Sequence, residues 1–283
     1  MPFNPSLIPD SLKRAYQDKR CAVLVGAGAS AGAGLPLWGA LLDQMISAAE
    51  GESVITTDRA AEYRKLLARP DKFLMVASGL KEDIGSLFDE FIDKTFVASH
   101  PKPTALHQAL TALENLPFVL TTNYDTLIED AYQSVGKKVA VCTFLDAGEI
   151  QRRIAKREFF LLKAHGDAAR LGNGIVLTDV DYRDLLYNKR GYQSMLSTMF
   201  TICSIVFVGA SMADPEINLL LNYLADAFSA TSGPMHYALL SKEDITDVEK
   251  NRWRKDFKIQ IIPISKADNY AELTEFLVEL QKA

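Results

Sequence analysis

The sequence is poor in cysteine, has no excess of basic residues and has no apolar run near its N-terminus. Its 283 residues include three cysteines, and the formal net charge is −5. Because Cys21, Cys142 and Cys203 lie far apart and form no CxxC pair, a disulfide framework and a four-thiolate zinc site are excluded, and we expect three buried thiols. The acidic balance offers no basic surface, so direct binding of nucleic acid is not expected.

Targeting and membrane-spanning segments are not indicated either. Residues 1–16, MPFNPSLIPDSLKRAY, contain no apolar core before their charges, unlike a secretory signal. Residues 21–42 carry no charge, but five glycines and a proline make this stretch a poor lipid-facing helix. We therefore expect no membrane association and a cytoplasmic location.

What the sequence does contain is a series of short apolar runs that stop at small or polar residues. They do not alternate with polar residues, which is typical of strands buried on both faces of a parallel sheet. Amphipathic stretches such as LWGALLDQMISAAE and TLIEDAYQSV separate them. The pattern predicts an α/β fold, a Rossmann-like open parallel sheet with flanking helices. The runs begin at Cys21, Phe118, Phe159, Ser204, His236 and Ile259.

Between the first two runs the pattern is helical, without a convincing strand. We predict one domain over residues 1–283, with a Rossmann-like core at 19–50 and 117–283 and a helical insertion at 51–116. Ligands of such sheets bind at the carboxyl ends of the strands. The residues expected to converge there are Gly28, Ser30, Asn123, Asp125, His165 and Ser211.

The first candidate motif is the glycine-rich turn over residues 26–31, GAGASA, between a predicted strand and a helix. Its GxGxx[G/A] form suits phosphate, because glycines allow close approach of the backbone and the next helix offers free amides. A tight turn also uses small residues for packing alone, so both interpretations stay open. No second strand ends in an acidic residue to hold a ribose, which argues against a conventional hydride-transfer enzyme.

The second motif, TTNYD at residues 121–125, follows a buried strand. Thr122 or Asn123 could cap the next helix, with Asp125 in its first turn. Such a cap does not need Asn and Asp together, so a catalytic role is equally open.

The third motif is KAHGD at residues 163–167, in which His165 ends an apolar strand beside a glycine. A neutral imidazole there can act as a general base or orient a ribose hydroxyl. His100, His107 and His236 are weaker candidates, His107 being expected to pack or cap a helix. The four histidines do not have a metal-ligand spacing.

The fourth motif is VGAS at residues 208–211, followed by a helix expected near Pro215. Ser211 could bond a ribose or a phosphate. Alternatively, Ser211 or Asp214 could cap that helix.

These four motifs, in this order, resemble the sirtuin superfamily. The segments GLPLWGALL, TTNYDTLIEDAY and VGASMADPEI are most similar to the sirtuin-like NAD-hydrolase branch of bacterial antiphage defence systems. Deacylase sirtuins carry two zinc-binding CxxC pairs after the catalytic histidine, whereas only Cys203 follows His165 here. The resemblance thus implies the sirtuin core without its zinc module, and no metal is expected.

The resemblance also implies roles for individual residues. Asn123 and His165 match the two catalytic positions, and Asp125 matches the acidic residue on the nicotinamide side. The residues expected to bind the dinucleotide are Gly26, Ala27, Gly28, Ser30, Thr122, Gly209 and Ser211.

The implied function is hydrolysis of NAD⁺ to ADP-ribose and nicotinamide. An enzyme that destroys a central cofactor must be held inactive until triggered, so we expect a homo-oligomer controlled by a partner. The resemblance suggests a separately encoded ATPase of the HerA type or another sensor protein. Two alternatives remain: an assembly scaffold that binds NAD or ADP-ribose without turnover, and a zinc-free deacylase or ADP-ribosyltransferase.

Overall fold

A seven-stranded parallel sheet forms the centre of the chain in the computed structural model, which describes residues 3–210, 212, 215–227 and 233–283. The strand order is β3-β4-β2-β1-β5-β6-β7. The strands are β1 (Cys21–Val25), β2 (Phe118–Thr121), β3 (Val141–Thr143), β4 (Phe160–Lys163), β5 (Ser204–Val208), β6 (His236–Ser241) and β7 (Ile259–Ile264). The predicted α/β fold is confirmed.

The central strand β1 is buried on both faces, as its uninterrupted apolar sequence predicts. Val23 pairs with Val119 of β2 on one side and with Val206 of β5 on the other. From β1 the chain first builds the sheet toward β2, β4 and β3, and afterwards adds β5, β6 and β7 on the opposite side. The strand order therefore reverses between β1 and β5, and such a point opens a crevice at the carboxyl ends of the strands.

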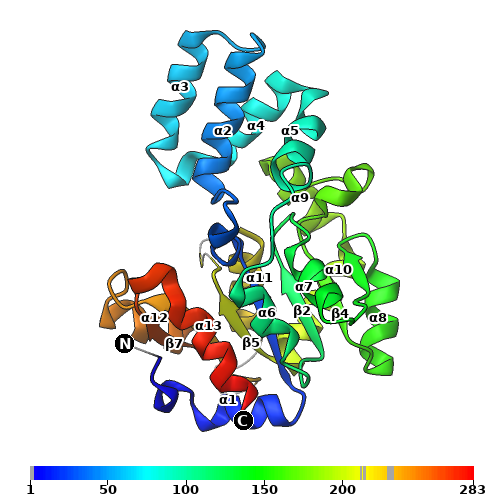
Figure 1. The fold of residues 1–283 in the computed structure, drawn as a ribbon, viewed down its shortest axis with the longest axis vertical. Helices are drawn as coiled ribbons and strands as arrows, with labels where there is room; N and C mark the ends of the chain where they lie inside the picture. The colour runs from blue at the N-terminus through cyan, green and yellow to red at the C-terminus, as the bar shows by residue number, and fades with distance from the viewer. Residues whose placement is uncertain (1–2, 211, 213–214, 228–232) are drawn as a thin grey trace.

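Helices cover both faces of the sheet (Figure 1). Alternate residues of β1 enter two separate cores: Val23 faces α1, α6, α7 and α13, and Leu24 faces α9, α10 and α11. In α13 the buried residues Leu273, Phe276, Leu277 and Leu280 follow the spacing of one helix face. The covering helices are α1 (Asp10–Gln17), α6 (Ala105–Thr111), α7 (Leu127–Ser134), α8 (Ala147–Lys156), α9 (Asp179–Tyr187), α10 (Arg190–Ile202), α11 (Pro215–Ala227), α12 (Asp247–Phe257) and α13 (Ala267–Gln281).

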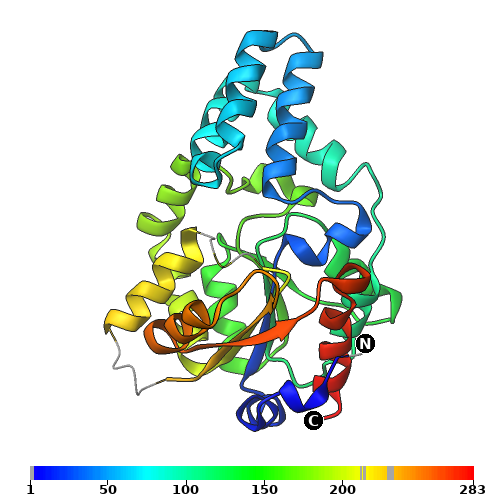
Figure 2. The same cartoon turned by 90° about the vertical axis from the view of Figure 1, so that its left-hand side faces the viewer.

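A third hydrophobic core lies among the helices between β1 and β2. Figures 1 and 2 show these helices stacked together at one end of the molecule, away from both termini. The helices are α2 (Trp38–Gly51), α3 (Thr57–Leu67), α4 (Phe73–Ile84) and α5 (Leu87–Phe96), with a 3₁₀ turn at Pro70–Lys72. α2 packs on α3 and α4, whereas α6 packs on α7 and α13. Division of the chain at residues 51 and 116 stays a prediction.

The three cysteines are free and buried, as expected. Burial raises the pKa of all three thiols, so they are neutral core groups near neutral pH. In the described part of the chain, no helix combines the length and the apolar composition that crossing a membrane requires.

Candidate functional site

The glycine-rich turn after β1 packs directly on the turn after β5. The Gly26 amide donates to the Val208 carbonyl (3.0 Å), and the Gly28 amide donates to the Gly209 carbonyl (2.8 Å). Gly209 has a φ of +60°, and a Cβ there would lie 2.5 Å from the Ala29 nitrogen. The glycines are therefore required for contact between two backbones. Binding of phosphate by this turn stays a prediction.

Asn123 joins the turn after β2 to the glycine-rich turn. Its Nδ2 donates to the Gly26 carbonyl (3.2 Å) and to Ser30 Oγ (3.0 Å), and its own amide donates to Thr121 Oγ1 (3.0 Å). The side chain is buried, yet Oδ1 has no hydrogen-bond partner among the described residues. Since buried acceptors are nearly always paired, this oxygen is available to a ligand.

Asp125 makes both a capping bond and a bond to the glycine-rich turn. Its Oδ2 accepts a hydrogen bond from Ser30 Oγ (2.8 Å), and its Oδ1 accepts one from the Leu127 amide (3.0 Å). The alternative in which Thr122 or Asn123 caps the next helix, with Asp125 in its first turn, is wrong, because α7 begins at Leu127 and its N-cap residue is Thr126. Asp125 lies just before the helix and accepts the first helical amide. Its other oxygen remains committed to Ser30, which a cap alone does not need.

His165 lies two residues beyond the end of β4 and is 3% exposed. Its ring meets Tyr182 of α9 edge to face, with centroids 5.2 Å apart. The adjacent Gly166 has a φ of +95°, and a Cβ there would collide with the Gly174 carbonyl. A glycine is therefore required at position 166, where the backbone turns sharply after His165. Tyr182 could not be anticipated, because it comes from a distant helix without a local signal.

The other histidines have structural positions. His107 caps α6, as expected, by accepting the Thr104 amide at Nδ1 (3.2 Å). His236 opens β6 and accepts the Ile205 amide (3.1 Å). Among the residues that the structure describes, no group of three or more His, Cys, Asp or Glu could hold a metal ion.

A cavity of about 1400 Å³ lies at the carboxyl ends of the strands. It exceeds the roughly 300–1000 Å³ of an ordinary small-molecule pocket, and it has room for an extended ligand such as a dinucleotide. Trp38 and Phe73, whose rings meet edge to face at 5.5 Å, line it from the helices between β1 and β2. The predicted site residues that line it are Gly26, Ala27, Gly28, Ser30, Thr122, Asn123, Asp125, His165 and Gly209. Ser211 lies outside the described residues.

Among the described residues that line this cavity, every charged side chain is acidic. Asp125 lies in the turn after β2 and Asp71 in the 3₁₀ turn between α3 and α4. Asp268 lies at the start of α13 and Glu275 in the middle of that helix. Residues 268–270 have left-handed φ angles of +50°, +54° and +60°, which costs about 1–2 kcal/mol for each residue. One border of the cavity is thus strained backbone.

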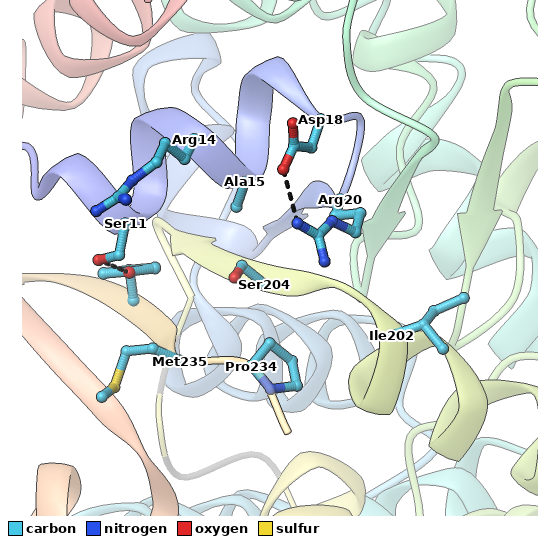
Figure 3. A pocket seen from close by; sticks show the side chains of 10 residues that line it. Ser11, Arg14, Ala15, Asp18, Arg20, Ile202, Ser204, Pro234 and Met235 are labelled. Atoms are coloured by element: carbon cyan, nitrogen blue, oxygen red, sulfur yellow. Dashed lines mark hydrogen bonds and ion pairs between the residues drawn. The ribbon is translucent and has the colours of Figure 1, made fainter. Parts of the chain in front are cut away.

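A second, smaller hollow of about 330 Å³ lies at the opposite edge of the sheet (Figure 3). Ser204 at the start of β5 lies in it, together with Arg14, Asp18 and Arg20. Asp18 and Arg20 form an ion pair of 2.6 Å. Since ligands of open α/β sheets bind at the carboxyl ends of the strands, the larger cavity is the candidate site.

Comparison with known proteins identifies the family of this chain. The profile of the SIR2-like domain family matches residues 117–262, which hold β2 to β6 and most of β7, together with Asn123, Asp125 and His165. The chain belongs to the SIR2-like family. The resemblance predicted from the four motifs is confirmed at this level.

The names of three relatives refer to defence or to NAD⁺ hydrolysis. Defense-associated sirtuin 2 of Bacillus subtilis is 30% identical over 216 residues, which are 75% of this chain and 20% of that protein. The NAD(+) hydrolase ThsA of Bacillus cereus (strain MSX-D12) is 25% identical over 99% of this chain and 58% of its own length. ThsA of Acinetobacter baumannii (strain 532279) is also 25% identical, over 96% of this chain and 55% of its own length. This SIR2-like chain therefore spans only part of each relative.

A solved structure described as the structural basis for the mechanism and regulation of Sir2 enzymes covers 97% of this chain and 100% of its own. Its TM-score is 0.44 and its sequence identity is 14%.

Proposed function

We propose that this SIR2-like protein hydrolyses NAD⁺ at the nicotinamide–ribose bond and releases nicotinamide and ADP-ribose. The observation that carries the proposal is the meeting of Asn123, Asp125 and His165 on the wall of one cavity at the carboxyl edge of the sheet. The names of the ThsA relatives, NAD(+) hydrolases, support the same reaction.

The reaction suits these three side chains. Nicotinamide in NAD⁺ is a cationic leaving group; when the C–N bond breaks, the electron pair stays on its nitrogen and it departs neutral. Asp125 supplies negative charge near the oxocarbenium-like ribose that forms. Water then adds to the anomeric carbon, and His165 accepts its proton. The unpaired Oδ1 of Asn123 accepts a hydrogen bond from that water or from a ribose hydroxyl.

The rest of the dinucleotide is proposed to cross the reversal point between β1 and β5. Gly26, Ala27, Gly28, Ser30 and Gly209 would contact its pyrophosphate and ribose groups, with Thr122 beside the nicotinamide end. Because the Gly28 amide donates to Gly209, phosphate contact at Gly28 requires a local shift of this turn. No lysine or arginine is among the described residues lining the cavity, so backbone amides must supply most of the phosphate contacts.

The biological setting is proposed from the relatives and the resemblance. The name of Defense-associated sirtuin 2 supports a role in defence. The resemblance narrows this role to antiphage defence, where NAD⁺ depletion would stop the infected cell. We propose a cytoplasmic homo-oligomer that is switched on by a partner, either a separately encoded ATPase of the HerA type or another sensor protein.

The direct test is release of nicotinamide from NAD⁺ by the purified chain, alone and with the products of its neighbouring genes. Asn123→Ala and His165→Ala are each expected to lower the rate by about 100-fold or more, because general-base and positioning groups contribute on that scale. His100→Asn is the control, since His100 is exposed in a loop and its φ of +48° suits asparagine.

Two outcomes contradict the proposal. Binding of NAD⁺ without turnover, even with every candidate partner, would favour an assembly scaffold. Preferential turnover of an acyl-lysine peptide or transfer of ADP-ribose to protein would favour a zinc-free deacylase or an ADP-ribosyltransferase.

A further inference from the structure

Lys163 is a charged side chain with no exposed surface, at the end of the apolar strand β4. Four oxygen atoms surround its Nζ. Two belong to carboxylates, Asp167 at 2.8 Å and Glu129 at 3.1 Å. Two are main-chain carbonyls, of Asp125 at 2.7 Å and Tyr124 at 3.2 Å. The ammonium therefore binds two main-chain carbonyls as well as two carboxylates.

These partners belong to the two turns that carry the candidate catalytic residues. The carbonyls of Tyr124 and Asp125 follow Asn123 in the turn after β2, and Asp167 lies two residues beyond His165. A direct bond from the Ala168 amide to the Tyr124 carbonyl (2.9 Å) joins the same two turns. One ammonium thus connects the turn of Asn123 and Asp125 with the turn of His165.

Packing alone does not explain a charge at this position. Burial of an ammonium costs several kcal/mol, and an apolar residue of similar volume often replaces a buried ion pair without loss of stability. Burial alone would lower the pKa of Lys163, but the Glu129 and Asp167 carboxylates outweigh burial and raise it, so the group stays charged. A neutral apolar side chain would leave two turn carbonyls without this donor.

We propose that Lys163 is a positioning residue of the candidate site. Its ammonium fixes the main chain at Tyr124 and Asp125, so that the side chains of Asn123 and Asp125 stay on Ser30 and near His165. The catalytic part of this inference rests on the proposed function; the fixing of the turn does not.

The test variant removes the ammonium without leaving unpaired buried carboxylates. It combines Lys163→Met with Glu129→Gln and Asp167→Asn. Expected are an NAD⁺ dissociation constant within about threefold of wild type at full stoichiometry and a kcat per bound site lower by about 100-fold. Counting bound sites separates lost positioning from lost folded protein.

The matched control is Lys137→Met. Lys137 Nζ donates to the Thr111 carbonyl (3.0 Å) and pairs with Glu114 (3.0 Å), is exposed, and does not line the cavity. This variant removes a lysine, an ion pair and a bond to a main-chain carbonyl that belong to neither turn, so kcat is expected to stay within about twofold of wild type.

Hydrogen exchange of the turn tests the inference independently of turnover. Amides of residues 122–128 are expected to exchange at least about tenfold faster in the triple variant, while those of β1 and β5 stay unchanged. If wild type releases no nicotinamide, the proposed function fails and this readout still decides the role of Lys163.

Wild-type exchange in residues 122–128, or a wild-type kcat per bound site, would overturn the inference. Should the triple variant not fold, Lys163→Gln with Glu129→Gln and Asp167→Asn removes the charge but keeps a neutral donor at the position, and the same two measurements are made on it.

Discussion

His236 is a buried histidine whose position makes stability depend on pH. Burial, assisted by the positive charge of Lys258, lowers the pKa of His236 to about 4. In the unfolded chain the pKa returns to about 6.5, so the unfolded state takes up a proton first as the pH falls. The contribution of neutral His236 to stability is therefore complete above about pH 6.5 and is lost progressively down to about pH 4.

The free energy of unfolding is accordingly expected to fall by about 3 kcal/mol over this window because of His236 alone. In His236→Asn the Oδ1 atom can still accept the Ile205 amide. This variant is expected to reduce the dependence of the free energy of unfolding on pH, measured by urea titrations at several pH values. His100→Asn is the control and is expected to leave it unchanged. Equal slopes in all three proteins would show that His236 does not titrate on unfolding.

For single residues, the sequence predicts which polar side chains lie at the strand ends better than it predicts their hydrogen-bond partners. Asn123, Asp125 and His165 reach one cavity because residues that end parallel strands meet at one edge. Ser30 as the common partner of Asn123 and Asp125 depends on the path of the glycine-rich turn, which motif spacing does not contain. Lys163 was visible in its motif, but its four acceptors come from two turns and a helix.

The contact between the turns after β1 and β5 is an element that a single methyl group would disrupt. Gly209→Ala is unfavourable for two reasons: the backbone at this position is left-handed, and the added Cβ would lie 2.5 Å from the Ala29 nitrogen. We expect a loss of about 3 kcal/mol or more in the free energy of unfolding, since neither backbone can yield easily.

Gly136→Ala is the matched control. Gly136 has a φ of +72°, but nothing lies within 4 Å of an added Cβ. Its loss of about 1–2 kcal/mol reports the left-handed conformation alone, and the difference between the two variants in denaturant titrations reports the clash. Equal losses would mean that the two turns separate without cost.

The six apolar runs predict β1, β2, β4, β5, β6 and β7, and each strand starts within one residue of its run. β3 was missed, because a three-residue edge strand is too short for a pattern and its first residue is half-buried. The helices between β1 and β2 were predicted, but the separate hydrophobic core that they form was not. An apolar helix face in the sequence does not show which other face it packs against.

For the whole molecule, a ligand that binds only the folded chain must raise its stability. ADP-ribose at 100 times its dissociation constant is expected to add about 2.7 kcal/mol, which for a chain of this length is a shift of about 4–5 °C in Tm. Inorganic pyrophosphate is the control, because it carries the negative charge without the adenosine and the ribose. An equal shift with pyrophosphate would indicate simple anion binding, for example at the arginine-lined hollow of Figure 3, instead of binding in the large cavity.

The core among α2–α5 also holds residues that follow the two turns of the candidate site. Leu127 directly follows the turn of Asp125, and Ala168 follows that of His165; both are buried in this same core. The helices that bring Trp38 and Phe73 to the cavity therefore share one set of packed side chains with the residues that follow both turns. Any displacement of α2–α5 would change the packing of Leu127 and Ala168, so the positions of the two turns depend on the positions of these helices.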